Sequence, residues 1–402
     1  MNPDQKGIPA RRGVVASVGL ERQATLPAMP SASYSNTTLN ADTELRKRCT
    51  RWLNGHRPPL SIRESLLALA ELPEAELPLD VYGQGQAIQA LEAEVAALLG
   101  KPAARFMHKG VAAQLAALRV HCGEGDGPVA LHPQSHIAID EAEAFEKLLG
   151  LRGLRIGMTD EPFGTAQLAS LPGQPAVVVV ELPLRRAGYR LPEWDELMAI
   201  SAWCRAAGVP LHFDGARLWE ASAHYGRPLA EIAALADSVY VSFYKGLGGL
   251  AGCVLAGSED FIAQIAPWQT RLAGNLFTVH PYVLSALHGL RTQLPRMPAY
   301  RERAQALAAL LVAEPGWRVA PEKPQVNAFQ LHLPVAPEVL REGLLEVARR
   351  DGFWLGARTV ASHVLAGGAM VEVVIGDAAD SWTDHEALAA LRRAVLSAQA
   401  GR

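Results

Sequence analysis

The sequence of 402 residues has few cysteines, and their positions do not suggest disulfide bonds. Cys49, Cys122, Cys204 and Cys253 are far apart, and no CxxC pair is present. Small secreted domains that rely on disulfides have closely spaced, patterned cysteines, so that class of protein is excluded. We therefore expect a reducing compartment, and the predicted location is the cytoplasm.

The chain also lacks an excess of charge of one sign. It contains 38 Lys+Arg and 41 Asp+Glu, which gives a formal net charge of −3. Binding to nucleic acid or to an anionic membrane through overall charge requires a strongly basic protein, so we predict neither partner. A small molecule is the expected partner.

Long apolar runs are missing as well. No uninterrupted apolar stretch reaches about 18 residues, the length that would indicate a transmembrane helix. The first forty residues contain Arg11 and Arg12, but no compact apolar segment follows them as it would in a signal peptide. We interpret residues 1–40 as a flexible N-terminal arm, and an organelle transit peptide is the alternative.

The composition is that of a globular protein, with 49% hydrophobic and 20% charged residues. At roughly 100–200 residues per domain, the length predicts two or three domains. Short apolar runs alternate with longer segments of helical periodicity, and these runs are GPVALHP, AVVVVELP, VPLHFDGA and DSVYVSFYKG. This alternation predicts an α/β fold with a mainly parallel sheet.

Prolines around LRTQLPRMPAY mark the predicted domain boundary. Residues 41–295 are predicted to form a large domain with N-terminal helices ahead of the sheet. Residues 296–402 are predicted to form a smaller α+β domain, because amphipathic helices there alternate with the strand-like runs QVNAFQLHLPV and AMVEVVIGD.

The segment HFDGARLWEA, residues 212–221, contains the first candidate site residues. Asp214 and Arg217 stand where a buried strand runs into a turn and a helix. In open α/β sheets ligands bind at the carboxyl ends of the strands, so these two residues are candidates for ligand binding. The alternative is that Asp214 is an ordinary helix N-cap.

The segment VSFYKGLGGLAGCVLAG contains the second candidate. Lys245 follows an apolar strand and precedes several glycines. A lysine amine in an apolar pocket has a lowered pKa and is a good Schiff-base nucleophile. A phosphate loop is a weaker interpretation, since the GxxxxGK[ST] spacing is absent, and a surface lysine at a turn is the remaining alternative.

Together the two segments suggest one cofactor. Asp214 and Lys245 are 31 residues apart, which is enough for one helix and one strand. Pyridoxal phosphate needs a lysine that forms a Schiff base and a carboxylate opposite its pyridine nitrogen. The pair therefore predicts a pyridoxal 5'-phosphate site, and no metal site is predicted.

Five segments, in order, resemble the threonine aldolase and β-eliminating lyase family of pyridoxal phosphate enzymes. They are VYGQGQAIQALEAEVAALLGK, FMHKGVAAQLAALRVHC, HIAIDEA, HFDGARLWEA and YKGLGGLAGCVLAG, and they lie between about Val81 and Gly274. The resemblance implies the aspartate aminotransferase-like fold (fold type I), with a mainly parallel seven-stranded sheet in the large domain and a small α+β C-terminal domain.

The resemblance also implies roles for individual residues. Lys245 would form the Schiff base, Asp214 would pair with the pyridine nitrogen, and His136 would stack on the ring and shuttle protons. Arg217 would lie near the cofactor's phenolic oxygen or the substrate carboxylate. The phosphate would be held by backbone amides at the start of a helix, where the helix dipole favours an anion, and these belong to Lys109, Gly110 and Val111.

Several departures from the family pattern affect substrate recognition. Leu182-Pro183-Leu184 follows Glu181 where the family has Asn-Thr-His, and Tyr244 stands where many members have serine. The strand-like run that would contain the family's carboxylate-binding arginine contains Glu372 instead. The candidate replacements are arginines elsewhere in the chain, namely Arg185, Arg271 and Arg358, with Arg186 next to the first.

The predicted activity is retro-aldol cleavage of a β-hydroxy-α-amino acid, with threonine or allo-threonine giving glycine and acetaldehyde. His136, or a water that it positions, is the predicted base. The alternatives are another pyridoxal phosphate reaction at Cα or Cβ, such as β-elimination or transamination, and a binding protein that kept the fold without turnover. The resemblance implies a homodimer or homotetramer.

Overall fold

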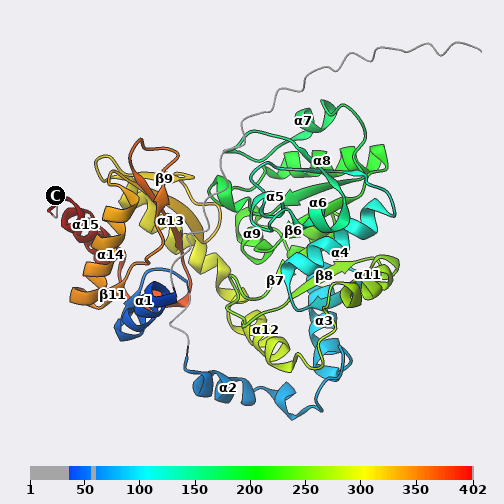
Figure 1. The fold of residues 1–402 in the computed structure, drawn as a ribbon, viewed down its shortest axis with the longest axis horizontal. Coiled ribbons are helices and arrows are strands. Elements are labelled where there is room, and N and C mark those ends of the chain that lie inside the picture. Colours follow the sequence, from blue (N-terminus) through cyan, green and yellow to red (C-terminus); the bar gives the residue numbers. More distant parts are fainter. Residues whose placement is uncertain (1–35, 56–59, 401–402) are drawn as a thin grey trace, which may run out of the picture. The chain divides into compact units, whose positions relative to one another are not determined.

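A computed structural model describes the fold of residues 36–55 and 60–400 (Figure 1). Its largest sheet has seven strands, which are β2 (Ala103–Met107), β3 (Pro128–Leu131), β4 (Arg152–Arg155), β5 (Val177–Glu181), β6 (Leu211–Gly215), β7 (Ser238–Ser242) and β8 (Cys253–Gly257). Their order is β2-β8-β7-β6-β5-β3-β4. Only β8 is antiparallel to its neighbours, β2 and β7. The predicted mainly parallel sheet is confirmed, as a mixed sheet with one reversed strand.

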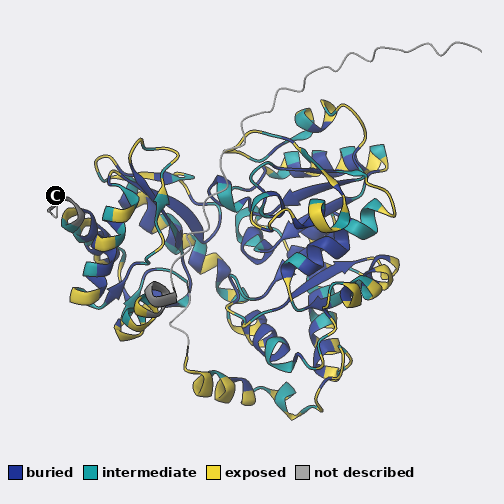
Figure 2. Cartoon of the chain, viewed as in Figure 1, coloured by how far each residue is buried: buried dark blue, intermediate teal, exposed yellow. Residues whose placement is uncertain are grey.

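Helices lie on both faces of this sheet, so its central strands are buried on both sides (Figure 2). The longer helices are α3 (Gln86–Leu99), α4 (Gly110–Cys122), α8 (Trp194–Ala207), α11 (Glu259–Arg271) and α12 (His280–Thr292). In β5, Val177 and Val179 pack with Leu115 of α4, whereas Val178 and Val180 belong to the core on the other face. This two-sided burial explains why β5 is a continuous apolar run.

The C-terminal part forms a smaller domain around an antiparallel sheet in the order β12-β13-β10-β9. Its strands are β9 (Arg318–Ala320), β10 (Ala328–Leu333), β12 (Val360–Ala361) and β13 (Ala369–Val374). Its long helices are α13 (Met297–Val312), α14 (Pro337–Asp351) and α15 (Asp384–Ala400). The predicted small α+β domain is confirmed.

The remaining elements lie within or between these two parts. They are α1 (Asn36–Arg48), β1 (Arg51–Trp52), α2 (Ile62–Ala70), η1 (Pro73–Glu76), α5 (His136–Ile139), α6 (Ala144–Leu149), α7 (Thr165–Ala169), η2 (Arg185–Ala187), α9 (Leu218–Tyr225), α10 (Leu229–Ala233), η3 (Leu294–Arg296), β11 (Phe353–Trp354) and η4 (Asp377–Ser381). None of the helices in the described ranges has the length and apolar character needed to cross a membrane.

The N-terminal boundary of the large domain differs from the prediction. Strand β1 pairs in parallel with β11 of the C-terminal domain, and Gly55 forms a bridge with Ile375. Residues 41–55, which the sequence assigned to the large domain, are therefore part of the C-terminal one. A strand of two residues whose partners lie 302 positions away has no periodic signal, so this pairing could not be predicted from the sequence pattern.

The predicted flexible arm falls mostly outside the described residues. Only residues 36–40 of the segment 1–40 are described, and they form the first part of helix α1. The predicted end of the arm, residue 40, is therefore a few residues beyond the start of α1 at Asn36.

Buried Asp80 fixes the start of α12 to the segment that precedes α3. Its carboxylate accepts hydrogen bonds from Val279 N (2.8 Å), His280 N (3.0 Å) and Thr278 Oγ1 (2.8 Å). Because the Asp80→Ala change leaves these donors without a partner, we expect the free energy of unfolding to fall by about 1–3 kcal/mol. Urea denaturation measures this loss.

Exposed Glu76 supplies the control for that measurement. The change Glu76→Ala is expected to alter stability by no more than about 0.5 kcal/mol, as is usual for surface substitutions. Equal effects of the two substitutions would contradict the capping role of Asp80.

Candidate functional site

The carboxyl ends of three neighbouring parallel strands bring ionisable side chains together. Glu181 ends β5, and its register partner in β6 is Asp214. Lys245 follows β7, the next strand, in a turn closed by a hydrogen bond from Gly248 N to Lys245 O (3.1 Å). The predicted juxtaposition of Asp214 and Lys245 thus follows from the strand order β7-β6-β5.

Burial dominates the electrostatics of this group. Burial, together with the nearby positive charge of Arg217, lowers the pKa of Lys245 to about 8, while the charge of Asp214 opposes that shift. Burial likewise raises the pKa of Asp214, against the positive charges of His136 and Lys245. A lysine with this pKa has a substantial neutral, nucleophilic fraction near neutral pH.

Glu181 connects the site to two neighbouring segments. Its Oε2 accepts a hydrogen bond from His136 N (2.6 Å), and its Oε1 accepts one from Arg185 N (3.1 Å). Burial and the adjacent Asp214 charge raise the pKa of Glu181 above its ordinary range. The main chain at both His136 and Arg185 is therefore held against the ends of β5 and β6.

His136 is half-buried at the start of α5, and a carboxylate holds its ring. Its Nδ1 lies 3.1 Å from Oε1 of Glu141. Burial alone would lower the pKa of His136, but the Glu141 hydrogen bond and the Asp214 charge outweigh it and raise the pKa. With Nδ1 engaged, Nε2 is the ring nitrogen available for proton transfer.

The start of α4 has the features of an anion site. Gly110 is its first residue, and a side chain there would clash with the hydroxyl of Tyr240, so the close packing requires glycine. No side chain caps the N-terminal amides of this helix. The Nζ atoms of Lys109 and Lys245 each lie 5.9 Å from the centroid of the Tyr244 ring, which places the helix start and the lysine around one side chain.

The arginines predicted for the substrate carboxylate have different surroundings. Arg217 follows β6 and lies over the ring of Tyr189, with 5.4 Å between its Cζ and the ring centroid. Arg185 forms an ion pair with Glu372 (2.7 Å). Arg186 instead binds both oxygens of Asp140, at 2.9 and 2.5 Å.

Arg271 and Arg358 do not contact the ionisable side chains at the strand ends. Arg271 is exposed on α11 and stacks on Trp268, with 4.6 Å between its Cζ and the ring centroid. Arg358 is exposed between β11 and β12. Within the described ranges, neither forms a hydrogen bond or an ion pair with Lys245, Asp214 or Arg185.

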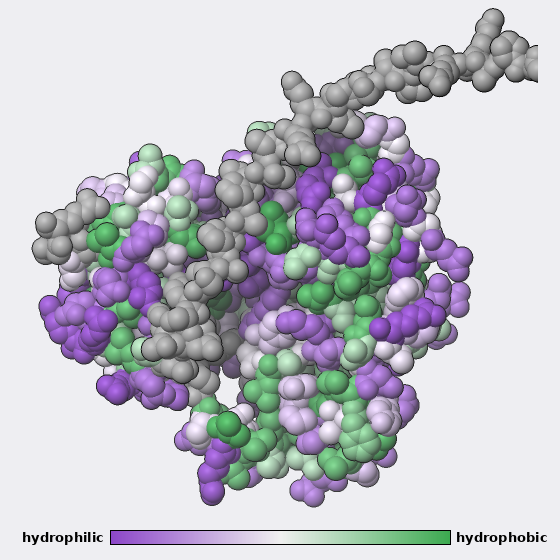
Figure 3. All heavy atoms as spheres, viewed as in Figure 1, coloured by the Kyte–Doolittle hydropathy of each residue, from purple (hydrophilic) through white to green (hydrophobic). Residues whose placement is uncertain are grey.

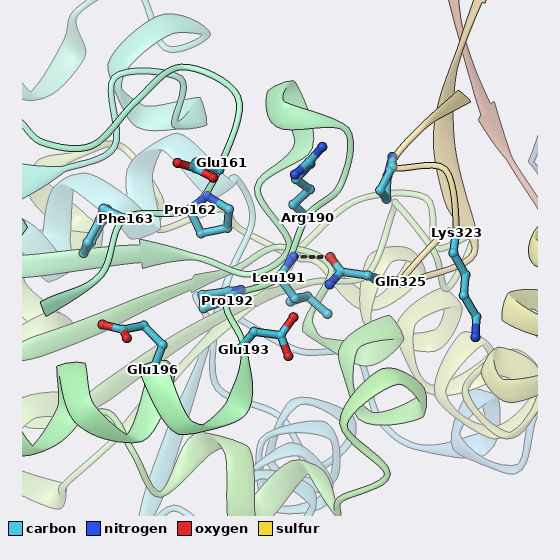
Figure 4. Close-up of a pocket in the computed structure, with 11 residues that line it drawn as sticks. Glu161, Pro162, Phe163, Arg190, Leu191, Pro192, Glu193, Glu196, Lys323 and Gln325 are labelled. Carbon is cyan, nitrogen blue, oxygen red and sulfur yellow. Dashed lines mark hydrogen bonds between the residues drawn. The ribbon is translucent and has the colours of Figure 1, made fainter. Parts of the chain in front are cut away.

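A separate cavity of about 410 Å³ lies beside the segment that contains Arg185 (Figure 4). Its walls include Arg190 and Glu193 of the large domain and Lys323 and Gln325 of the small one. A hydrogen bond from Leu191 N to Gln325 Oε1 (2.7 Å) joins the two walls. Because the lining residues do not include Lys245 or Asp214, this cavity is distinct from the strand-end site.

The strand-end site fits pyridoxal 5'-phosphate, the cofactor that the resemblance implies. Among the described residues, the Asp214 carboxylate accepts only one long hydrogen bond, from Ala216 N at 3.4 Å, although it is buried. A protonated pyridine nitrogen would supply the missing donor. Lys245 supplies an amine of lowered pKa, and the first amides of α4 supply donors for a phosphate. No cluster of three or more metal-ligating side chains occurs in the described part of the chain.

Three acidic residues of this region have no role predicted from the sequence, and they are Glu141, Glu220 and Glu372. Glu220, on α9, is buried beside Gly246 with no hydrogen-bond partner for either carboxylate oxygen in the described ranges. Burial raises the pKa of Glu220 to about 8. The signals for these residues were faint: Glu141 lies five positions after His136, and Glu372 interrupts the apolar run AMVEVV.

Comparisons with known proteins identify the family of the chain. The family model described as beta-eliminating lyase matches residues 69–333, more than half of the chain. The chain is 25% identical over 355 residues to low-specificity L-threonine aldolase 1 of Arabidopsis thaliana, covering 85% of this chain and 95% of that protein.

Two solved structures are also similar over nearly their whole length. One, from Listeria monocytogenes, is provisionally assigned as an L-allo-threonine aldolase and is 32% identical, with a TM-score of 0.82. The other, from an Exiguobacterium species, is provisionally assigned as an aromatic amino acid beta-eliminating lyase/threonine aldolase and is 33% identical, also with a TM-score of 0.82. Each match covers 89% of this chain and 99% of the other. From the family match and these two relatives together, we conclude that the chain belongs to the beta-eliminating lyase family.

Proposed function

We propose that this chain is a pyridoxal-phosphate-dependent aldehyde-lyase that cleaves β-hydroxy-α-amino acids of the threonine type into glycine and an aldehyde. The observation that carries the proposal is the pairing of a buried carboxylate, Asp214, with a lysine of lowered pKa, Lys245, at neighbouring strand ends. The threonine aldolases among the relatives support this reaction over others on the same fold.

Residues of this chain would hold the cofactor at three points. Lys245 would bind it through its amine, Asp214 would accept a hydrogen bond from its ring nitrogen, and the amides of Lys109, Gly110 and Val111 would bind its phosphate. When bound, the cofactor supplies an electron-accepting ring that takes up the electrons released as the Cα–Cβ bond of the substrate breaks.

Proton movement is assigned to His136. Retro-aldol cleavage requires that the β-hydroxyl proton is removed, so that the oxygen can form the carbonyl of the leaving aldehyde. Nε2 of neutral His136 is the proposed acceptor, and Glu141 at Nδ1 stabilises the imidazolium that results. A proton returned to Cα then completes glycine.

The substrate carboxylate is assigned to two arginines. Arg185 and Arg217 both lie close enough to Lys245 for their charges to lower its pKa. Arginine matches a carboxylate with paired N–H donors, which favours it for this role. Arg271 and Arg358, the other candidates from the sequence, are exposed elsewhere and are not included.

β-Elimination is the second candidate, because the family description itself names that reaction. The two reactions give different products from the same site. Elimination from serine or cysteine releases pyruvate, whereas retro-aldol cleavage of threonine releases acetaldehyde.

We also propose that two copies of the chain assemble into a homodimer, with a homotetramer as the larger alternative. Hydrophobic residues lie at the surface around α2 (Figure 3). They include Ile62, which is 81% exposed, and Leu66, which is 54% exposed. Tyr82 and Phe277 form an exposed aromatic pair, with 5.4 Å between their ring centroids. A second copy of this chain would remove these side chains from water.

Two expectations from the composition stay predictions. They are the cytoplasmic location, expected from four scattered cysteines, and the absence of a nucleic-acid partner, expected from the near-neutral charge.

The reaction is tested by product analysis. With the cofactor supplied, we expect acetaldehyde and glycine in equal amounts from L-threonine or L-allo-threonine, measured by a coupled alcohol dehydrogenase assay. The Lys245→Ala variant is expected to lose at least about a thousandfold in kcat, because both the cofactor attachment and a proton-transfer group are removed. Pyruvate from serine without aldehyde from any β-hydroxy amino acid would contradict the aldolase assignment.

The pH profile tests the pairing of His136 with Glu141. A general base must be neutral, so kcat rises with pH through the pKa of His136, which Glu141 holds above its ordinary value. In Glu141→Gln the negative partner is lost and the pKa falls, so the rising limb is expected to move to lower pH. Glu143→Gln, at an exposed position in the same segment, is the matched control and leaves the limb in place. An unmoved limb in Glu141→Gln would rule out His136 as the titrating base.

Assembly is measured by light scattering coupled to gel filtration. The wild type is expected at twice or four times the mass of one chain. Replacement of Ile62 and Leu66 by aspartate is expected to shift the protein toward the monomer, because charges would be buried at the interface. A wild-type protein with the mass of a single chain would contradict the proposed homodimer.

A further inference from the structure

Arg185 lies at the junction between the large-domain site and the small domain. It begins η2, directly after β5, and its backbone N donates to Glu181 Oε1 (3.1 Å). Its side chain is 16% exposed, and its charge contributes to the lowered pKa of Lys245. The main chain of Arg185 is thus held by the strand ends of the site, and its guanidinium is close enough to Lys245 for its charge to act on the lysine amine.

The small domain holds the turn at Arg185 through two opposite residues of its sheet. Glu372 of β13 and Gln330 of β10 are register partners. Glu372 Oε2 accepts from Arg185 Nη2 (2.7 Å), and Gln330 Nε2 donates to Arg186 O (3.1 Å). One residue therefore fixes the side chain and the other fixes the main chain of the same turn.

Glu372 is itself held in place by the segment that follows β1. Asn54 Nδ2 donates to Glu372 O (2.9 Å), and Asn54 Oδ1 accepts from Val374 N (2.9 Å). These two bonds span Val373, the residue after Glu372. Strand β13 is therefore held at this point by β10 along one edge and by the side chain of Asn54 along the other.

The guanidinium of Arg185 is only partly satisfied by these contacts. Its Nε is buried without a hydrogen-bond partner among the described residues, and its Nη1 lies 4.0 Å from Asp140. The neighbouring Arg186, by contrast, forms a bidentate pair with both oxygens of Asp140. Since a guanidinium carries five N–H donors, Arg185 has capacity for one further anion.

The charges favour a permanent cation at this position. Burial would lower the pKa of Arg185, but the charge and hydrogen bond of Glu372, together with those of Tyr189, outweigh it and raise the pKa above its ordinary value. Removing Glu372 would leave a partly buried cation whose remaining anion, Asp140, is 4.0 Å away, and the side chain of Arg185 would have more freedom.

We propose that Glu372 is a positioning residue, which holds Arg185 in the orientation that binds the carboxylate of the amino-acid substrate. This inference rests on the proposed function, because it assumes that an amino acid is the ligand. It also couples substrate affinity to the small domain, since Glu372, Gln330 and Asn54 all belong to that domain.

The opposite mechanism makes a different prediction. If Glu372 occupied the place of the substrate carboxylate on Arg185, it would compete with the substrate, and its removal would tighten binding. A positioning residue instead makes binding weaker when it is removed. The sign of the change in affinity therefore separates the two.

The experiment measures glycine binding to the cofactor-loaded enzyme through the change in its visible absorbance, together with KM and kcat for threonine. For Glu372→Gln we expect about ten- to a hundredfold weaker glycine binding and a similar rise in KM, with kcat within about threefold of the wild type. Glu372→Asp, which keeps the charge, is expected to recover part of the affinity. Glu346→Gln removes another arginine-paired glutamate of the small domain and serves as the control without effect.

A double-mutant cycle shows whether Glu372 acts through Arg185. In the Arg185→Met background, Glu372→Gln is expected to cause no further loss of glycine affinity. Tighter glycine binding in Glu372→Gln, a fall in kcat without a change in affinity, or additive losses in the double variant would each overturn the proposal. If the wild type binds glycine but releases no aldehyde, the proposed reaction fails, while the affinities still decide the role of Glu372.

Discussion

The structure depends on the burial of one lysine and two carboxylates at the ends of adjacent parallel strands. Lys245, Asp214 and Glu181 all have pKa values shifted toward the neutral form, and burial is the largest cause in each case. Removing charged groups from water is costly unless partners compensate them. A phosphate-bearing ligand can supply such partners here, because the amides at the start of α4 are uncapped and the Asp214 carboxylate accepts only one long hydrogen bond among the described residues.

Glu181 shows how this constraint extends through the large domain. Its two carboxylate oxygens accept from the main chain at His136 and at Arg185, so the proposed base and the proposed substrate arginine are positioned by one buried side chain. The site then continues into the small domain, where Glu372 pairs with Arg185. Catalytic geometry and domain contact are in this way parts of one hydrogen-bonded arrangement.

Sequence reasoning succeeded where the relevant signal was local. Continuous apolar runs identified β5, β6 and β7, because strands buried on both faces must be apolar throughout. Asp214 and Lys245 were found because each stands at the end of such a run. The helix over 86–99 was likewise visible from its periodicity and from Gly100, which is left-handed at its C-cap.

The features that were missed depend on long-range contacts. The pairing of β1 with β11 and the role of Glu372 join positions that are 302 and 187 residues apart. Neither a two-residue strand nor a single acidic residue has a pattern of its own. The sequence offered no way to choose among the arginines for the same reason, since Arg271 and Arg358 differ from Arg185 only in where the fold places them.

The central claim is that Lys245 is the residue that binds the cofactor. The most direct measurement is to load the protein with pyridoxal phosphate, reduce the adduct with borohydride, and locate the modified lysine by peptide mass spectrometry. The account predicts the modification at Lys245, and predicts that it depends on the folded protein. A modification at Lys109 or another lysine with Lys245 unmodified, or no stable adduct in the folded protein, would contradict it.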